Sequence, residues 1–267
     1  MEFVLTAPPS LSRVFEREIA ALPATQREAH GRVLVNLGLQ GPNTLLHDGR
    51  AWKRLPPQQI VADTRAALAC RGRFALIVHA SYAFLRGAET AEPGDKLRPI
   101  IEAALEAEQL VLDDPRPSWV VRLGYLYGPE ARDLRLYRRA FRLGRPYWAG
   151  PDAARHDHLH SADAARAVLA LTRLRPQGRP IYATDGTPVS FRTFMDHFAQ
   201  SIGNPIPLPI PHFLRMPAHR VVAEEHMQMC ELGVRGKTGP QVNGFTPRFP
   251  NYRAGIDAVL AEWRIEP

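Results

Sequence analysis

Short apolar runs alternate with amphipathic segments along almost the whole chain, and this alternation restricts the fold more than any other feature of the sequence. Runs typical of buried strands lie at residues 3–5, 33–37, 74–79, 119–123 and 181–183. Most of the segments between them place apolar residues at helical spacing and are long enough for crossover connections. Strands that are apolar throughout and alternate with helices are typical of a parallel sheet covered on both faces. The sequence therefore predicts an α/β fold.

The first strand turns directly into a helix, which is how a dinucleotide-binding fold begins. Such a turn normally carries three glycines, because a Cβ would keep the backbone away from a pyrophosphate and the helix away from the strand. Here Thr6 precedes the turn, and Ala7, Ser10 and Arg13 stand at the glycine spacing. The sequence keeps the layout of a nucleotide site without its glycines.

The connection from the first helix to the second strand is too short for a complete nucleotide-binding half. It is the polar stretch at residues 23–32, where a standard half would need another strand, helix and strand. The missing unit normally ends in the acidic residue that binds the adenosine ribose. We therefore expect a sheet that is shortened in its first half and lacks this second determinant of cofactor binding.

The chain is basic, with a formal charge of +7 and an isoelectric point near 9.8. A basic surface attracts phosphates of any kind, so the charge does not choose between a nucleotide-linked substrate, a nucleic acid and an acidic partner. Nucleic acid is the weakest of these, because no helix-turn-helix, RRM or zinc pattern occurs. No apolar run approaches the length of a membrane span, and we expect a cytoplasmic protein that does not bind membranes.

Several motifs along the chain resemble those of one protein family. They are, in chain order, Val121-Arg122 with Tyr127-Gly128-Pro129, then Asp157-His158-Leu159-His160-Ser161-Ala162-Asp163, then Tyr182-Ala183-Thr184-Asp185-Gly186, and finally Pro247-Arg248-Phe249-Pro250-Asn251-Tyr252. In this order and spacing the chain resembles the extended short-chain dehydrogenases/reductases, the NAD-dependent epimerase/dehydratase group. The resemblance implies a Rossmann-like doubly wound parallel sheet over residues 1–185 and a smaller α-rich C-terminal lobe over residues 186–267.

The family binds NAD or NADP through the motif T-G-x-x-G-x-x-G, of which only Thr6 remains here. The resemblance makes Thr6, Ala7, Ser10, Arg13 and, on the second strand, Asn36 the candidate cofactor-binding residues. Arg13 does not replace a glycine at a point of close packing, but its guanidinium suits a phosphate. The departure from the motif puts the binding of NAD or NADP in doubt.

Catalysis in the family uses a tyrosine four residues before a lysine on one helical face. The lysine and the cofactor lower the pKa of the tyrosine, so that the phenol exchanges a proton with the substrate oxygen. With Glu108 taken as the acidic residue that follows this pair, the two positions fall on Ile100 and Ala104. Neither side chain carries a proton, so the family's catalytic pair is absent.

Three neighbouring residues are the remaining catalytic candidates. Ser81 and Tyr82 lie at the end of the strand, in the region from which the family's serine comes, and Lys96 lies at the start of the following helix. Tyr82 is either a displaced acid or a tyrosine packed in a loop. No tyrosine stands four residues before Lys96, so the usual pair cannot be formed there.

The resemblance places Tyr127, Arg139 and His160 beside the substrate cleft. Arg139 belongs to an expected helix whose arginines at 132, 135, 139 and 142 share one face. That face is either a solvated basic surface or a site for a phosphate-bearing substrate or effector.

His160 belongs to a histidine-rich stretch, since residues 156 and 158 are also histidines. Alternate residues of a strand point to one side, as metal ligands often do. The resemblance instead gives this stretch the task of closing the substrate cleft. Capping preferences separately predict that Ser161 caps the next helix. We expect no metal.

The helices expected near residues 60–70 and 98–111 correspond to the pair through which family members form a four-helix dimer interface. Their apolar faces either form such an interface or pack on the sheet. A homodimer, or a heterodimer with a related subunit, therefore stays open.

Three losses coincide in this chain: the glycines, the strand-helix-strand unit and the Tyr/Lys pair. They favour a pseudoenzyme, that is, a non-catalytic binding or regulatory protein whose ligand is a partner protein or a phosphate-bearing small molecule. The alternative is an active NAD(P)-dependent oxidoreductase or epimerase with a rearranged site, acting on a sugar nucleotide or another carbonyl or hydroxyl substrate.

Overall fold

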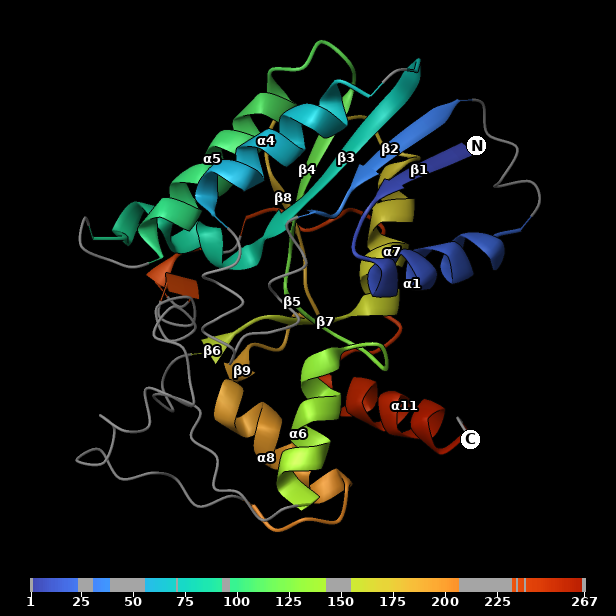
Figure 1. Cartoon of the computed structure of the whole chain (residues 1–267), viewed down its shortest axis with the longest axis vertical. Helices are drawn as coiled ribbons and strands as arrows, with labels where there is room; N and C mark the ends of the chain where they lie inside the picture. Colours follow the sequence, from blue (N-terminus) through green and yellow to red (C-terminus); the bar gives the residue numbers. More distant parts are fainter. Residues whose placement is uncertain are drawn as a thin grey trace.

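The computed structural model places most of the chain in two sets of elements, which Figure 1 shows one above the other. The described residues are 2–23, 31–38, 56–70, 72–92, 97–142, 155–206, 232–233, 235–237 and 239–265. Lys96, the loop expected over 38–57 and a helix expected over 212–232 fall wholly or largely outside these ranges.

The upper set is built on a five-stranded parallel sheet. Its order is β1-β2-β3-β4-β8, and its strands are β1 (Glu2–Thr6), β2 (Arg32–Asn36), β3 (Phe74–Tyr82), β4 (Ser118–Leu123) and β8 (Ile181–Ala183). All four pairings are parallel. The predicted α/β class and Rossmann-like sheet are confirmed.

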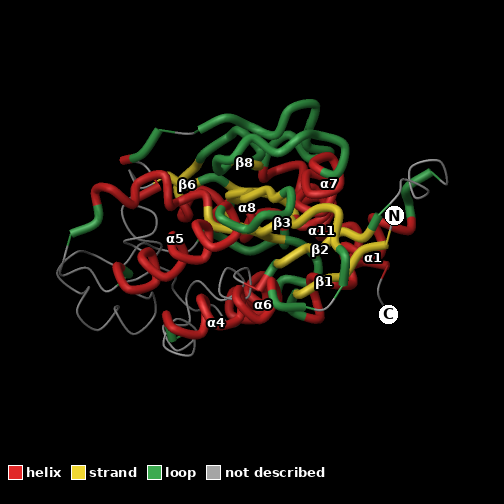
Figure 2. Tube along the Cα trace, turned by 90° about the horizontal axis from the view of Figure 1, so that it is seen from above, coloured by secondary structure: helices red, strands yellow, loops and turns green. Residues whose placement is uncertain are grey.

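Two pairs of helices cover the two faces of this sheet (Figure 1). Helices α1 (Pro9–Ala20) and α7 (Ser161–Leu171) lie on one face, and α4 (Pro57–Leu68) and α5 (Arg98–Leu112) on the other. Seen from above, the strands lie between α7 and the α4–α5 pair (Figure 2). Alternate residues of β2 pack on opposite faces of the sheet. Val33 and Val35 pack with α1 and α7, and Leu34 packs towards α5. Burial on both faces explains why the strands are apolar throughout.

Strand β1 stands at the edge of the sheet. A complete nucleotide-binding half would place two more strands beyond it. Instead β1 is joined through α1 directly to its neighbour β2, with Thr6 opposite Asn36 in the register. The predicted shortening therefore removes the outer strands and leaves the strand before the nucleotide turn at the edge.

The lower set combines two small sheets with three helices. Strands β5 (Tyr125–Tyr127) and β7 (His158–His160) pair in parallel, and β6 (Arg155–His156) and β9 (Val189–Ser190) pair antiparallel. Helices α6 (Arg132–Arg142), α8 (Phe191–Ser201) and α11 (Tyr252–Ile265) surround them (Figure 1). Ser190 caps α8 by accepting a 3.1 Å hydrogen bond from the amide of Thr193. In the part of the chain that is described, no helix is long and apolar enough to span a bilayer.

Candidate functional site

The turn from β1 into α1 has lost several of the amides with which a helix N-terminus binds phosphate. Pro8 caps the helix and Pro9 begins it, and proline has no amide hydrogen. The amides of Leu11 and Ser12 both donate to the carbonyl of Pro8, at 3.0 Å each. A pyrophosphate bound at this point normally accepts hydrogen bonds from such amides. The loss therefore concerns donors as well as glycines.

Asn36, at the end of β2, is engaged inside the protein. Its amide nitrogen lies 3.1 Å from Nδ1 of His79, and its side-chain oxygen accepts a 3.1 Å hydrogen bond from the amide of Gly38. Burial lowers the pKa of His79 to about 4, so the ring is neutral at physiological pH. Thr6 is exposed at the end of β1. Cofactor binding by these residues stays a prediction.

The positions of the family's catalytic pair lie inside the apolar core. Ile100 and Ala104 on α5 are 5% and 0% exposed, and both belong to the core cluster that also holds Tyr82. Glu108, one turn further, forms a buried ion pair with Arg122 on β4, at 2.7 Å. At these two positions α5 contributes packing and no group that exchanges protons.

Ser81 and Tyr82 end strand β3, and both are buried. The Tyr82 ring stacks on Phe84 with 5.2 Å between ring centres. Burial raises the pKa of the Tyr82 phenol far above its ordinary value. A tyrosine that exchanges protons near neutral pH needs the opposite shift. Tyr82 therefore stays a neutral phenol, and its proposed role as an acid stays a prediction.

Two side chains of the histidine-rich stretch have structural contacts. The His158 ring stacks on Phe194 at 4.5 Å. Nδ1 of His160 accepts a 3.2 Å hydrogen bond from the amide of Ala162, so His160 caps α7. The predicted Ser161 cap is wrong by one residue, because Ser161 is already the first residue of the helix. Burial lowers the pKa of His160 to about 3.

The neighbouring acidic groups of this stretch are also structural. Asp157 pairs with Arg86, and both side chains are buried. Asp163 accepts hydrogen bonds from the amides of Arg248 and Phe249, at 2.8 and 2.9 Å, and so fixes the chain before α11. In the described parts of the chain, no three His, Cys, Asp or Glu side chains come together as a metal site would need.

The predicted substrate residues divide into two groups. Tyr127 and His160 lie opposite each other in the β5–β7 pairing, with ring centres 5.4 Å apart. The Tyr127 ring packs against Gly255 of α11, where any Cβ would collide with it. Arg139 is exposed on α6 and does not line either of two pockets that lie between described residues, one beside α1 and α11 and one beside α1 and α7.

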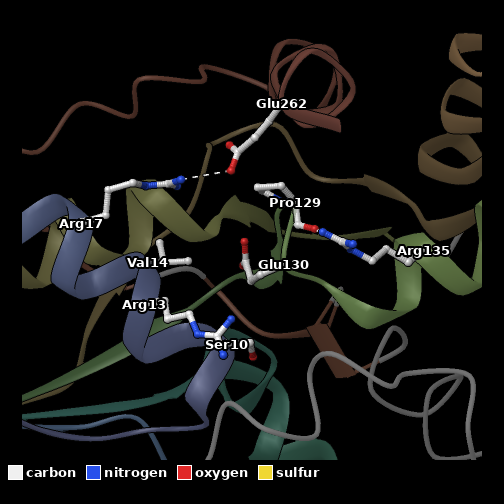
Figure 3. A pocket seen from close by; sticks show the side chains of 8 residues that line it. All are labelled: Ser10, Arg13, Val14, Arg17, Pro129, Glu130, Arg135 and Glu262. Carbon is white, nitrogen blue, oxygen red and sulfur yellow. Dashed lines mark hydrogen bonds and ion pairs between the residues drawn. The ribbon is translucent and has the colours of Figure 1, made fainter. Parts of the chain in front are cut away.

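A pocket of about 400 Å³ lies between α1, α11 and the segment that leads into α6 (Figure 3). Its lining residues are Ser10, Arg13, Val14, Arg17, Pro129, Glu130, Arg135 and Glu262. The structure thus brings two predicted cofactor residues, Ser10 and Arg13, to one cavity. Sequence reasoning missed Arg17 and Glu130. The spacing of Ser10, Arg13 and Arg17 along one helical face was a usable signal, whereas Glu130 gave none.

No protein-family model matches the chain. A 3-diazoavenalumate denitrifying reductase from a Streptomyces species is 28% identical over 161 residues, which are 58% of this chain and 51% of the reductase. The chain therefore matches about half the length of that curated relative.

Solved structures match almost the whole chain. Human epimerase family protein SDR39U1 with NADPH covers 98% of this chain and 99% of its own, with a TM-score of 0.66 and 14% identity. RMD from Pseudomonas aeruginosa complexed with NADPH covers 98% and 99%, with a TM-score of 0.60 and 18% identity. dTDP-glucose 4,6-dehydratase from Bacillus anthracis in complex with NAD covers 100% and 97%, with a TM-score of 0.62 and 12% identity.

These structures define the class of fold. The chain has the fold of the NAD(P)-dependent epimerases, dehydratases and reductases, as its motifs predicted. At these identities the likeness concerns the fold, and activity has to be argued from the site.

Proposed function

We propose that this chain is a non-catalytic member of the epimerase/dehydratase fold that acts by binding a phosphate-bearing small molecule or a partner protein. The observation that carries the proposal is the burial of Ile100 and Ala104, at 5% and 0% exposure, where the family has its tyrosine and lysine. Tyr82 does not replace them, because burial raises the pKa of its phenol. Without such a pair the protein cannot pass a proton to a substrate oxygen in the family's way.

Two features of the nucleotide turn support the same proposal. The prolines at 8 and 9 remove amide donors, and in the described sheet no strand lies on the outer side of β1 to supply a ribose-binding carboxylate. These features concern cofactor binding, and the α5 positions concern proton transfer. Cofactor binding and proton transfer are separate requirements of catalysis. The loss of residues for both favours a protein that no longer catalyses the family's reaction.

A second candidate is an NAD(P)-dependent reductase with a rearranged site. The similarity to a denitrifying reductase favours it, as do the NADPH and NAD in the solved structures. A reductase that delivers hydride to carbon, with no proton required at a substrate oxygen, would not need the Tyr/Lys pair. In this candidate Arg13 would bind a cofactor phosphate.

Cofactor oxidation separates the two candidates. We expect the purified chain, given NADPH and 3-diazoavenalumate, to oxidise no more cofactor than a protein-free control, and Tyr82→Phe to leave this background unchanged. Turnover by the native chain would reject the non-catalytic proposal. If Tyr82→Phe then lowered the rate while the chain stayed folded by circular dichroism, Tyr82 would be identified as an acid.

A further inference from the structure

The pocket of Figure 3 differs in chemistry from the nucleotide turn beside it. Its cations are guanidinium groups from two helices: Arg13 and Arg17 on α1, and Arg135 on α6. Side chains therefore supply the positive charge where a nucleotide fold would use backbone amides. Guanidinium groups bind phosphate through paired, charge-assisted hydrogen bonds.

Among the described residues that line the pocket, Arg13 is the cation that remains available. Arg17 forms a 3.1 Å ion pair with Glu262 of α11, and Nε of Arg135 donates to the carbonyl of Pro129 at 3.0 Å. Within the described part of the chain, the exposed Arg13 side chain has no hydrogen-bond or ion-pair partner. Its guanidinium extends into the cavity beside Ser10 (Figure 3).

Glu130 supplies a hydrogen-bond acceptor in the same cavity. Its Oε2 atom is buried and makes no hydrogen bond of ordinary geometry among the described residues, although the Ser161 hydroxyl lies close enough to oppose part of the rise in the carboxyl's pKa. Burial raises the pKa of this carboxyl above its ordinary value. Gly128 leaves room for the arrangement, since a Cβ there would collide with Glu130 and with the Ser161 hydroxyl. A buried polar atom without a partner is costly and marks a place where a ligand group can bind.

We infer that this pocket binds a small phosphate monoester that carries a hydroxyl group, with the phosphate on Arg13 and the hydroxyl donating to Glu130. The inference rests on the proposed function and specifies its small-molecule ligand. The volume of about 400 Å³ lies towards the lower end of small-molecule sites. Among the described residues, no aromatic side chain lines the pocket, so these residues offer a base no ring on which to stack. A phosphorylated polyol or sugar fits these features better than a nucleotide.

Calorimetric titration with glycerol 3-phosphate tests the site. Inorganic phosphate serves as the second probe, because it has no carbon-bound hydroxyl group to donate to Glu130. We expect saturable binding of glycerol 3-phosphate, weakened about tenfold or more in Arg13→Gln. Arg175→Gln is the matched control, because Arg175 is an exposed arginine after α7 that does not line the pocket. It should bind like the native chain. Equal weakening in both variants, or binding by neither probe, would overturn the site.

The role of Glu130 is tested by the pH dependence of the same titration. Arg17 from α1, Glu262 from α11 and Ser161 from α7 are the charged or polar groups that act on its carboxyl. As pH rises through its raised pKa, Glu130 becomes negative and repels the phosphate. We therefore expect the affinity of the native chain, divided by the affinity of Glu130→Gln, to fall as pH rises. The phosphate probe also titrates over this range, but it does so equally with both proteins, so its titration cancels in the ratio. A constant ratio would remove Glu130 from the site.

Titration with NADPH keeps the two proposals separate. Suppose that NADPH binds with a micromolar dissociation constant and that glycerol 3-phosphate still binds in a way that depends on Arg13. The non-catalytic function would then be rejected, and the pocket would remain supported. Absence of phosphate binding together with absence of NADPH binding would reject the pocket and leave partner binding as the proposed function.

Discussion

Replacement of Glu108 by alanine is expected to lower the free energy of unfolding by about 3–5 kcal/mol, the usual cost of breaking a buried ion pair on one side. Both carboxylate oxygens accept from the Arg122 guanidinium, at 2.9 and 2.7 Å, and the two side chains are only 4% and 12% exposed. Removal of Glu108 leaves a buried guanidinium whose remaining partner is the hydroxyl of Tyr182, at 2.9 Å. Urea denaturation followed by circular dichroism measures the loss.

Glu106 on the same helix provides the control. It also pairs with an arginine, Arg65, at 3.0 Å, but these side chains are 52% and 63% exposed. Water and salt screen such a pair, so Glu106→Ala should cost less than about 1 kcal/mol. Equal losses for the two variants would show that Glu108 is not buried as described, and would weaken the placement of Ile100 and Ala104 that depends on it.

Replacement of Asp185 by asparagine is expected to stabilise the protein at neutral pH by about 3–4 kcal/mol, with little gain near pH 4. Burial, with smaller contributions from Asp157 and Asp163, raises the pKa of Asp185 to about 7. An unfolded aspartate has a pKa near 3.9, so between these values the native state holds a proton that the unfolded chain releases. Native stability therefore falls as pH rises from about 4 to about 7.

The asparagine variant removes this titration and keeps the oxygen that accepts the 2.9 Å hydrogen bond from the amide of Thr187. Other carboxylates titrate in both proteins, so the difference in midpoint of thermal unfolding between variant and native chain is the quantity to follow from pH 4 to 8. Asp63→Asn, on the exposed face of α4, should show no such trend. A difference that did not change with pH would contradict the raised pKa.

The sheet was predictable because its strands are buried on both faces. Val33, Leu34 and Val35 pack into different layers, and a run with no polar face is the pattern that such burial requires. The edge position of β1 followed from the ten residues at 23–32, which are too few for the missing unit.

The candidate site was less predictable, because its contacts join distant parts of the chain. The pocket takes residues from positions 10–17, 129–135 and 262, and no local pattern relates Glu130 to Arg13. The His160 cap was missed because helix caps favour Ser, Thr, Asp and Asn, and a serine stands next to it. The arginines of α6 share one face by spacing, yet Arg135 turns to the pocket and Arg139 does not line it.

The central claim is that the nucleotide site has lost its function, and calorimetric titration of the purified chain with NADH and NADPH tests it most directly. We predict no saturable binding at millimolar cofactor, which corresponds to a binding free energy weaker than about −4 kcal/mol. A dissociation constant in the micromolar range for either cofactor would contradict the claim, and would make a search for the substrate of an active reductase the next step.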